Sequence, residues 1–242
     1  MFKGILAKSY FEFVQNGWLK SYLFRFCKDN KGNPLPLFSY PAIEYLDTLD
    51  MRESKILEIG SGYSTIFFAQ RAKQIISFES NSKWSTEIQN SLIKFNLDHK
   101  VNIHFIDTPK RIDSSSKSFR KETTDNYVKK LKEEIELKDK KFEIIIVDGW
   151  GFHRAILSKY LIKFLSDGGI FILDNADQVP KAQKILKDLG FIQIQFKGYA
   201  PGGIRNVTSI YFKGNLNIDA HQNNLFKLSM FSNSNNKKWI EV

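Results

Sequence analysis

The sequence has few of the features that mark special classes of protein. There is one cysteine, Cys27, in 242 residues, so no disulfide can form within the chain and no cysteine cluster can hold zinc. We expect Cys27 to be a buried apolar side chain. No apolar run approaches the roughly 18 residues of a membrane span, and the first residues lack the uninterrupted apolar stretch of a signal peptide. We therefore expect a cytoplasmic protein.

The composition is that of an ordinary globular protein. Apolar residues make up 42% of the chain and charged residues 26%, which argues against disordered, collagen-like and coiled-coil classes. There are no internal repeats. The net charge of +10 is spread along the chain rather than gathered in one stripe. It therefore favours a lysine-rich solvated surface over a nucleic-acid partner.

The ends of the chain differ from its middle. Residues 1–37 are predicted to form a helical extension, because aromatic and aliphatic side chains recur there with the spacing of an amphipathic helix. Lysines lie among them, so this helix fits either docking on its own domain, which we favour, or peripheral membrane contact. The main domain is predicted at residues 38–213. The Asn-rich residues 214–242 are expected to form a loosely ordered tail.

Strands and helices alternate along the main domain. Buried strands are predicted at residues 55–59, 74–79, 101–106, 142–147 and 169–173. Helices are predicted at residues 41–49, 63–72, 82–95, 125–137, 153–165 and 181–189. Two final strands, residues 191–197 and 207–213, are separated only by a loop and should pair as an antiparallel hairpin. This order predicts an α/β sandwich of three layers, with helices on both faces of a mostly parallel sheet.

Acidic or glycine-rich turns follow the strands. Ligands bind an open parallel sheet at the carboxyl ends of its strands, so these turns are the candidate site. The strand-end residues are Glu58, Gly60, Ser61 and Gly62 after the first strand, Glu79 after the second, Asp107 after the third, Asp148 after the fourth, and Asp174 and Asn175 after the fifth. The glycines allow a tight turn close to a ligand. A carboxylate at the position of Glu79 can accept hydrogen bonds from ribose hydroxyls.

Four segments carry a resemblance to a known family. They are residues 55–62 (KILEIGSG), Glu79, residues 144–149 (IIIVDG) and residues 167–175 (DGGIFILDN). Together they resemble the motifs of class I S-adenosylmethionine-dependent methyltransferases, over about residues 38–213. The resemblance implies a Rossmann-like sheet of seven strands in the order 3-2-1-4-5-7-6, with the last strand antiparallel. Residues 37–46 and 60–65 also resemble a bacterial branch of methyltransferases associated with surface polysaccharides.

The resemblance also implies roles for single residues. Gly60, Ser61 and Gly62 would face the methionine part of S-adenosylmethionine, with Glu58 acting through water. Glu79 would bind the ribose. Asp107 or Thr108 would lie beside the adenine, and Asp148 near the sulfonium. The implied activity is O-methylation of a small molecule or sugar.

Other functions remain open at this point. A nicotinamide-dependent oxidoreductase is disfavoured because Ser64 stands where the third glycine of the dinucleotide pattern belongs. The acidic turn after the fourth strand also suits a cationic sulfonium better than a phosphate. A nucleic-acid methyltransferase is disfavoured because the Asn/Asp-Pro-Pro-Tyr/Phe motif is missing. A non-catalytic module that keeps the fold for assembly is the remaining alternative.

Transfer to a hydroxyl requires removal of its proton, for which the sequence offers two solutions. The first is His153 as general base, with Asp148 orienting the cofactor or a metal. The second is Mg²⁺ bound by Asp148, Asp174 and Asn175, which match the ligands of catechol-type O-methyltransferases. Those enzymes carry a lysine where this chain has Gly151, so we favour a strand-end turn, with Asn175 or Asp177 capping the next helix.

The acceptor pocket is expected to include the residues after the fourth strand and the loop between the last two strands. The residues are Trp150, His153, Arg154 and Arg205. Two arginines would suit an acceptor that carries carboxylate or phosphate groups. Alternatively, they pair with Asp148 or Asp174.

Overall fold

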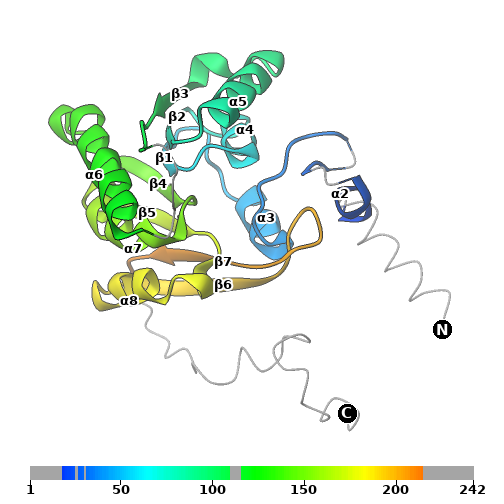
Figure 1. Cartoon of the computed structure of the whole chain (residues 1–242). Helices are drawn as coiled ribbons and strands as arrows, with labels where there is room; N and C mark the ends of the chain where they lie inside the picture. The colour runs from blue at the N-terminus through cyan, green and yellow to red at the C-terminus, as the bar shows by residue number, and fades with distance from the viewer. Residues whose placement is uncertain (1–17, 25–26, 30, 110–115, 215–242) are drawn as a thin grey trace, which may run out of the picture.

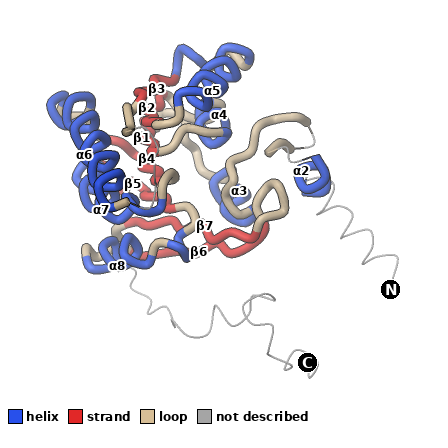
Figure 2. The backbone as a smooth tube through the Cα atoms, viewed as in Figure 1, coloured by secondary structure: helices blue, strands red, loops and turns tan. Residues whose placement is uncertain are grey.

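The computed structural model describes residues 18–24, 27–29, 31–109 and 116–214. Figure 1 and Figure 2 show one twisted sheet with helices on both of its faces. The predictions for residues 1–17 and 215–242 lie outside the described residues. No helix in the described ranges is long and apolar enough to cross a membrane.

The sheet has seven strands in the order β3-β2-β1-β4-β5-β7-β6, which confirms the predicted topology. The strands are β1 (Lys55–Ile59), β2 (Gln74–Glu79), β3 (Val101–Phe105), β4 (Phe142–Val147), β5 (Leu165–Leu173), β6 (Ile192–Tyr199) and β7 (Arg205–Phe212). The first five are parallel, whereas β7 runs antiparallel to both β5 and β6. The carboxyl ends of β1 to β5 therefore meet along one edge.

Helices cover the sheet in two groups (Figure 1). The helices are α2 (Trp18–Phe24), α3 (Tyr40–Asp47), α4 (Tyr63–Ala69), α5 (Ser82–Lys94), α6 (Lys117–Glu134), α7 (Gly151–Leu161) and α8 (Pro180–Asp188). One face carries α3, α4 and α5, and the other carries α6, α7 and α8. This is the arrangement that right-handed crossovers between parallel strands produce.

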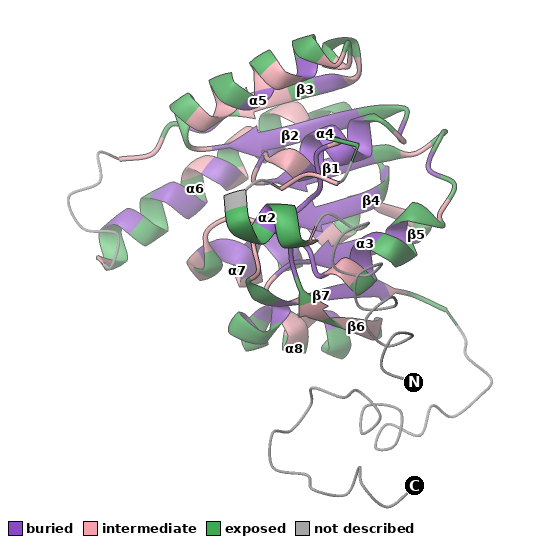
Figure 3. Ribbon diagram, turned by 90° about the vertical axis from the view of Figure 1, so that its right-hand side faces the viewer, coloured by how far each residue is buried: buried purple, intermediate pink, exposed green. Residues whose placement is uncertain are grey.

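Alternation along each strand divides the apolar core between these two faces. Leu57 and Ile145 pack under α6 and α7, whereas their neighbours Ile56 and Ile144 face α3, α4 and α5. The central strands β1, β2 and β4 are buried along most of their length, whereas β3 and β6 are largely half-buried. Exposure is concentrated on the outer sides of the helices (Figure 3). Such burial on both faces explains why the strands read as continuous apolar runs.

Several elements differ in length from the prediction. The helix expected at residues 125–137 begins at Lys117, because the Ser116 hydroxyl accepts a hydrogen bond from the backbone N–H of Phe119 and caps it. Its first turns are polar and carry little helical periodicity. The helix expected at residues 153–165 ends at Leu161, and β5 begins at Leu165 with an irregular register against β4. The β6–β7 hairpin is also longer than expected.

The helix α2 contacts the β6–β7 hairpin. The Trp18 ring stacks on Tyr22, with centroids 5.5 Å apart, and meets the Tyr199 ring edge-on at 5.9 Å. Tyr22 lies over Gly203, where an added Cβ would be 2.2 Å from the tyrosine ring. These contacts agree with a helix that docks on its own domain. Cys27 is half-buried rather than buried, and its burial raises the pKa of the thiol.

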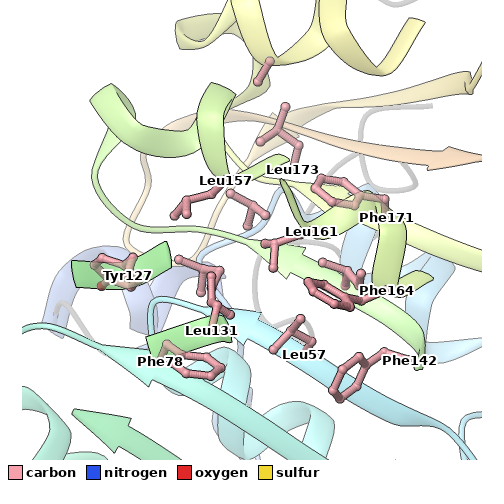
Figure 4. Close-up of a cluster of buried hydrophobic side chains, with 14 of the residues drawn as sticks. Leu57, Phe78, Tyr127, Leu131, Phe142, Leu157, Leu161, Phe164, Phe171 and Leu173 are labelled. Atoms are coloured by element: carbon pink, nitrogen blue, oxygen red, sulfur yellow. The ribbon is translucent and has the colours of Figure 1, made fainter. Parts of the chain in front are cut away.

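The packing of α6 against the sheet can be tested by truncating a buried side chain. Leu131 is fully buried on α6 in the cluster that includes Phe78 (Figure 4). We expect Leu131→Ala to lower the free energy of unfolding by about 2–5 kcal/mol, because apolar contact is lost and a cavity is left. Leu137→Ala is the matched control, since Leu137 is 71% exposed. Urea unfolding of the two variants should differ clearly, and equal losses would contradict the packing of α6.

Candidate cofactor site

A cleft opens at the carboxyl ends of β1, β2 and β4. Its volume is about 360 Å³, within the range of roughly 300–1,000 Å³ typical of small-molecule sites. The cleft is lined by Gly60, Glu79, Ser80, Tyr127, Gly149, Trp150 and Gly151. Two of the predicted cofactor-binding residues, Gly60 and Glu79, therefore face the same space as Trp150, which was predicted for the acceptor pocket.

Gly60 is the glycine that the turn after β1 requires. Its φ is +91°, and an added Cβ would lie 2.1 Å from the carbonyl oxygen of Asp148. Its N–H donates to the carbonyl of Phe78 at 2.8 Å, which ties the turn to β2. Gly62 is extended, with φ −171°, and a Cβ there would meet Ser64 Oγ at an ordinary 3.6 Å. Sterically, only the first glycine of the pair is needed.

Glu58 lies beneath this turn rather than in the cleft. It is fully buried and accepts hydrogen bonds from the hydroxyls of Ser64 at 2.6 Å, Thr65 at 2.6 Å and Ser77 at 2.7 Å. Burial raises the pKa of its carboxyl group to about 7, although the three hydroxyls oppose the rise. Glu58 thus joins β1 to β2 and to the first turn of α4. Its expected contact with the cofactor through water stays a prediction.

Glu79 ends β2 at the wall of the cleft and is 8% exposed. Its Oε1 accepts hydrogen bonds from the backbone N–H groups of Ser80 at 2.8 Å and Asn81 at 2.7 Å. Burial raises the pKa of this carboxyl group, these backbone hydrogen bonds oppose the rise, and the nearby Asp148 carboxylate adds to it. The backbone therefore fixes the orientation of a carboxylate that faces the cleft.

The other residues predicted to touch the cofactor are not part of the lining. The Ser61 hydroxyl hydrogen bonds to the Ser77 hydroxyl at 2.7 Å, and its carbonyl accepts from Trp84 Nε1 at 2.7 Å. Asp107 is exposed at the end of β3, and Thr108 is half-buried beside it. Their predicted contacts with the adenine are not tested by this geometry.

Tyr127 is a lining residue that sequence reasoning missed. It is 1% exposed on α6, a charged helix about 50 residues away along the chain from Glu79. The only local signal was an aromatic side chain in a polar segment, which does not indicate what it faces. Ser80, also missed, receives a hydrogen bond from Trp150 Nε1 at 3.3 Å.

The structure places His153 inside the core, which opposes its predicted role as general base. The side chain is fully buried on α7, and neither ring nitrogen has a hydrogen-bond partner. The ring lies 4.8 Å from that of Tyr127 and 5.0 Å from that of Phe152. Burial lowers its pKa to about 3. A general base must reach the proton it removes and hold it near neutral pH, and this histidine is placed to do neither.

Arg154 pairs with the residues at the ends of β4 and β5 and does not line the cleft. Its Nη2 lies 2.8 Å from Asp148 Oδ1 and 3.4 Å from Asn175 Oδ1. Its Nε donates to the Gly149 carbonyl at 3.0 Å, and Nη1 donates to the Asp174 carbonyl. Arg154 as a whole residue is 5% exposed. Arg154 therefore pairs with Asp148, which was the alternative to a role in acceptor binding. Arg205 is exposed.

Asp174 points away from Asp148, toward β7. Its Oδ1 accepts hydrogen bonds from Thr208 Oγ1 at 2.7 Å and Asn206 Nδ2 at 2.9 Å. Burial raises the pKa of Asp174 to about 7, and the charge of Asp148 contributes to the rise. Asn175 adopts left-handed φ of +43° and donates to Asn206 Oδ1 at 2.9 Å.

These contacts do not fit the predicted Mg²⁺ site. Side-chain nitrogens and a hydroxyl already contact Asp148 Oδ1, Asn175 Oδ1 and both carboxylate oxygens of Asp174. No cluster of three or more acidic, histidine or cysteine side chains suited to a metal occurs in the described part of the chain. The strand-end turn is therefore the better interpretation. Asn175 holds the N-cap position of the short 3-10 helix Ala176–Gln178, as predicted, but its side chain makes no capping hydrogen bond there. The helix α8 begins later, at Pro180 after Val179.

The raised pKa of Glu58 predicts a specific dependence of stability on pH. Between about pH 4.5 and 7 the unfolded chain has lost this proton while the folded protein keeps it. The free energy of unfolding should therefore fall as pH rises through this window, by up to ~3 kcal/mol. Glu58→Gln cannot titrate, so its difference from wild type should change across the window and be flat below it. Urea unfolding in steps from pH 4 to 8 measures this.

The same comparison controls for other titrating groups. Asp174 also has a raised pKa, but it is present in both proteins and cancels in the difference. Parallel stability profiles for wild type and Glu58→Gln would contradict the assignment.

Comparisons with known proteins bear on the fold. No protein-family model matches the sequence, and no curated protein sequence matches it significantly. The structure is similar to an O-methyltransferase from Bacillus cereus solved in complex with SAH, with TM-score 0.52 and 15% identity over 66% of this chain and 74% of that one.

Two further structures are similar in fold. One is the O-methyltransferase TomG from Streptomyces achromogenes in complex with SAM (TM-score 0.50, 16% identity, covering 67% of this chain and 75% of that one). The other is a precorrin-6y C5,15-methyltransferase from Geobacter metallireducens (TM-score 0.52, 14% identity, covering 79% and 95%). At these identities the likeness shows the fold, which is the Rossmann-like α/β sandwich found in these methyltransferases.

Proposed function

We propose that this protein is an S-adenosylmethionine-dependent methyltransferase that binds its cofactor in the cleft at the ends of β1, β2 and β4. The observation that carries the proposal is the pairing of Gly60 and Glu79 on that cleft. Gly60 brings bare backbone to the ligand, and Glu79 offers an oriented carboxylate to the ribose. The similar fold of enzymes solved with SAM and SAH supports the same cofactor.

The charges around the cleft favour a cation over a dinucleotide. Glu79 lies on the cleft wall. Burial raises the pKa of Glu79 and Glu58, and the nearby Asp148 carboxylate adds to both rises, so acidic side chains rather than basic ones lie around the cleft. In the first turn of α4, the hydroxyls of Ser64 and Thr65 already bind a buried carboxylate. A pyrophosphate at this helix start would lie beside that carboxylate, which is unfavourable. A positively charged sulfonium suits the same surroundings.

The role of the chain is to hold two reactants in line. S-adenosylmethionine supplies an activated methyl group when bound. Glu79 would fix the ribose, Asp148 would lie near the sulfonium, and Asp107 or Thr108 would flank the adenine. Because His153 is buried away from solvent, we propose that alignment of the reactants supplies most of the catalysis, rather than proton removal by this histidine.

The acceptor is proposed to be the hydroxyl of a small molecule or sugar. The resemblance of residues 37–46 to methyltransferases associated with surface polysaccharides supports a saccharide. Trp150 lines the cleft and Arg205 is exposed at the start of β7, and we propose that they contact an acidic sugar. A screen of sugars, nucleotide sugars and phenols with labelled S-adenosylmethionine identifies the acceptor. Cofactor binding without transfer to any acceptor would favour the non-catalytic alternative.

Cofactor binding is tested directly by calorimetry. Glu79→Gln should weaken S-adenosylhomocysteine binding by about tenfold or more, because a hydrogen-bond acceptor for the ribose is replaced by a donor. Glu87→Gln is the matched control, since Glu87 is exposed on α5, and its affinity should equal that of wild type. Tighter binding of NADH than of S-adenosylhomocysteine by wild type would overturn the proposal.

A further inference from the structure

The three residues predicted as metal ligands surround a cation that belongs to the chain itself. We propose that the Arg154 guanidinium is the built-in cation of this site, occupying the position between Asp148 and Asn175 that a divalent ion would need. The proposed consequence is that Asp148 and the cleft-lining Gly149 are held in place without a metal. The part of this inference that concerns the cofactor rests on the function proposed above.

A single nitrogen of Arg154, Nη2, contacts three oxygen acceptors. Arg154 Nη2 is 2.8 Å from Asp148 Oδ1, 3.4 Å from Asn175 Oδ1 and 2.5 Å from the Gly149 carbonyl. A divalent ion bound by the same oxygens would have to displace this nitrogen. Hard oxygen ligands around one centre are what Mg²⁺ needs, and here a guanidinium nitrogen takes that place.

The rest of the guanidinium is also satisfied. Nε donates to the Gly149 carbonyl, and Nη1 donates to the Asp174 carbonyl. A buried charge is tolerated only when it is paired and hydrogen bonded, and Arg154 meets both conditions at 5% exposure. Arginine presents a rigid fork of donors. The cation is part of the chain, unlike a bound ion.

The short connection between β4 and α7 positions the Arg154 guanidinium. Asp148 and Gly149 directly follow β4, and Arg154 lies in the first turns of α7, which begins at Gly151. The same short segment thus carries both the carboxylate and its counter-ion. Contacts with the Asp174 carbonyl and with Asn175 extend the link to the end of β5. Arg154 is a positioning residue, because it acts on the cleft through Asp148 and Gly149.

Asp174, the third residue expected to bind a metal, has different partners for its carboxylate and for its backbone carbonyl. The Asp174 carboxylate is held by Thr208 and Asn206 of β7, and Asn206 also donates to the Leu37 carbonyl at 2.7 Å. Arg154 reaches only the backbone carbonyl of Asp174. Removing the guanidinium would leave Asp148 without its counter-ion and would open a space lined by oxygens, which is where a divalent ion would bind.

The test uses Mn²⁺ as the probe, followed by electron paramagnetic resonance and thermal unfolding. Wild type should bind no Mn²⁺ with Kd below about 1 mM, and neither EDTA nor Mn²⁺ should change its midpoint of unfolding. Arg154→Met keeps an unbranched apolar stem but removes the charge. It should unfold at a lower temperature and recover part of that loss when Mn²⁺ is added.

Two control proteins separate a cation site from ordinary stabilisation. Lys159→Met removes an exposed positive charge from the same helix and should respond to Mn²⁺ no more than wild type does. Arg154→Met combined with Asp148→Asn should lose the Mn²⁺ response, because its main ligand is gone. An arginine with a merely structural role would lower the unfolding midpoint without creating any Mn²⁺ site.

Either of two results would overturn the inference. One is Mn²⁺ binding by wild type that Asp148→Asn abolishes, since a metal then coexists with the guanidinium. The other is a folded Arg154→Met protein that gains no Mn²⁺ response. If Arg154→Met does not fold, the wild-type titration still decides. All of these measurements can be read without S-adenosylmethionine, so a failure of the proposed function is seen separately, in the calorimetry of the Glu79 variants.

Discussion

The contact between the turns after β1 and β4 is the constraint on which the site depends. Gly60 approaches the carbonyl of Asp148 so closely that no side chain fits between them. This contact brings the two turns together at the centre of the sheet. The cleft forms beside it, between these turns and the end of β2, with Glu79 on its wall.

Two buried polar groups support the contact from opposite faces of the sheet. On the α4 side, the Glu58 carboxyl group accepts hydrogen bonds from three hydroxyl groups and joins β1 to β2. Toward β5, Arg154 links the end of β4 to that of β5. Each group is costly to bury alone and is stable because its partners are complete. The edge of the sheet is therefore held by side-chain hydrogen bonds as well as by the backbone ladder.

Much of the fold could be read from the sequence because its signals are local. The buried strands appear as apolar runs, and the acidic or glycine-rich turns mark their carboxyl ends. Contacts between segments that are distant in the sequence were not predicted correctly. The orientation of α7 about its own axis places His153 in the core beside Tyr127. No spacing rule indicates that Arg154, rather than a metal ion, binds Asp148. The placement of Tyr127 and the partnership of Asp174 with Asn206 likewise depend on packing between elements.

The proposed cofactor cleft is tested most directly by hydrogen exchange with and without S-adenosylhomocysteine. The amides around residues 60–62, 79–81 and 149–151 should exchange more slowly in the presence of the ligand, because these segments form the walls of the cleft. The amides of α3 and of the β6–β7 hairpin should change little. Protection confined to those other elements, or no protection at saturating ligand, would contradict the account.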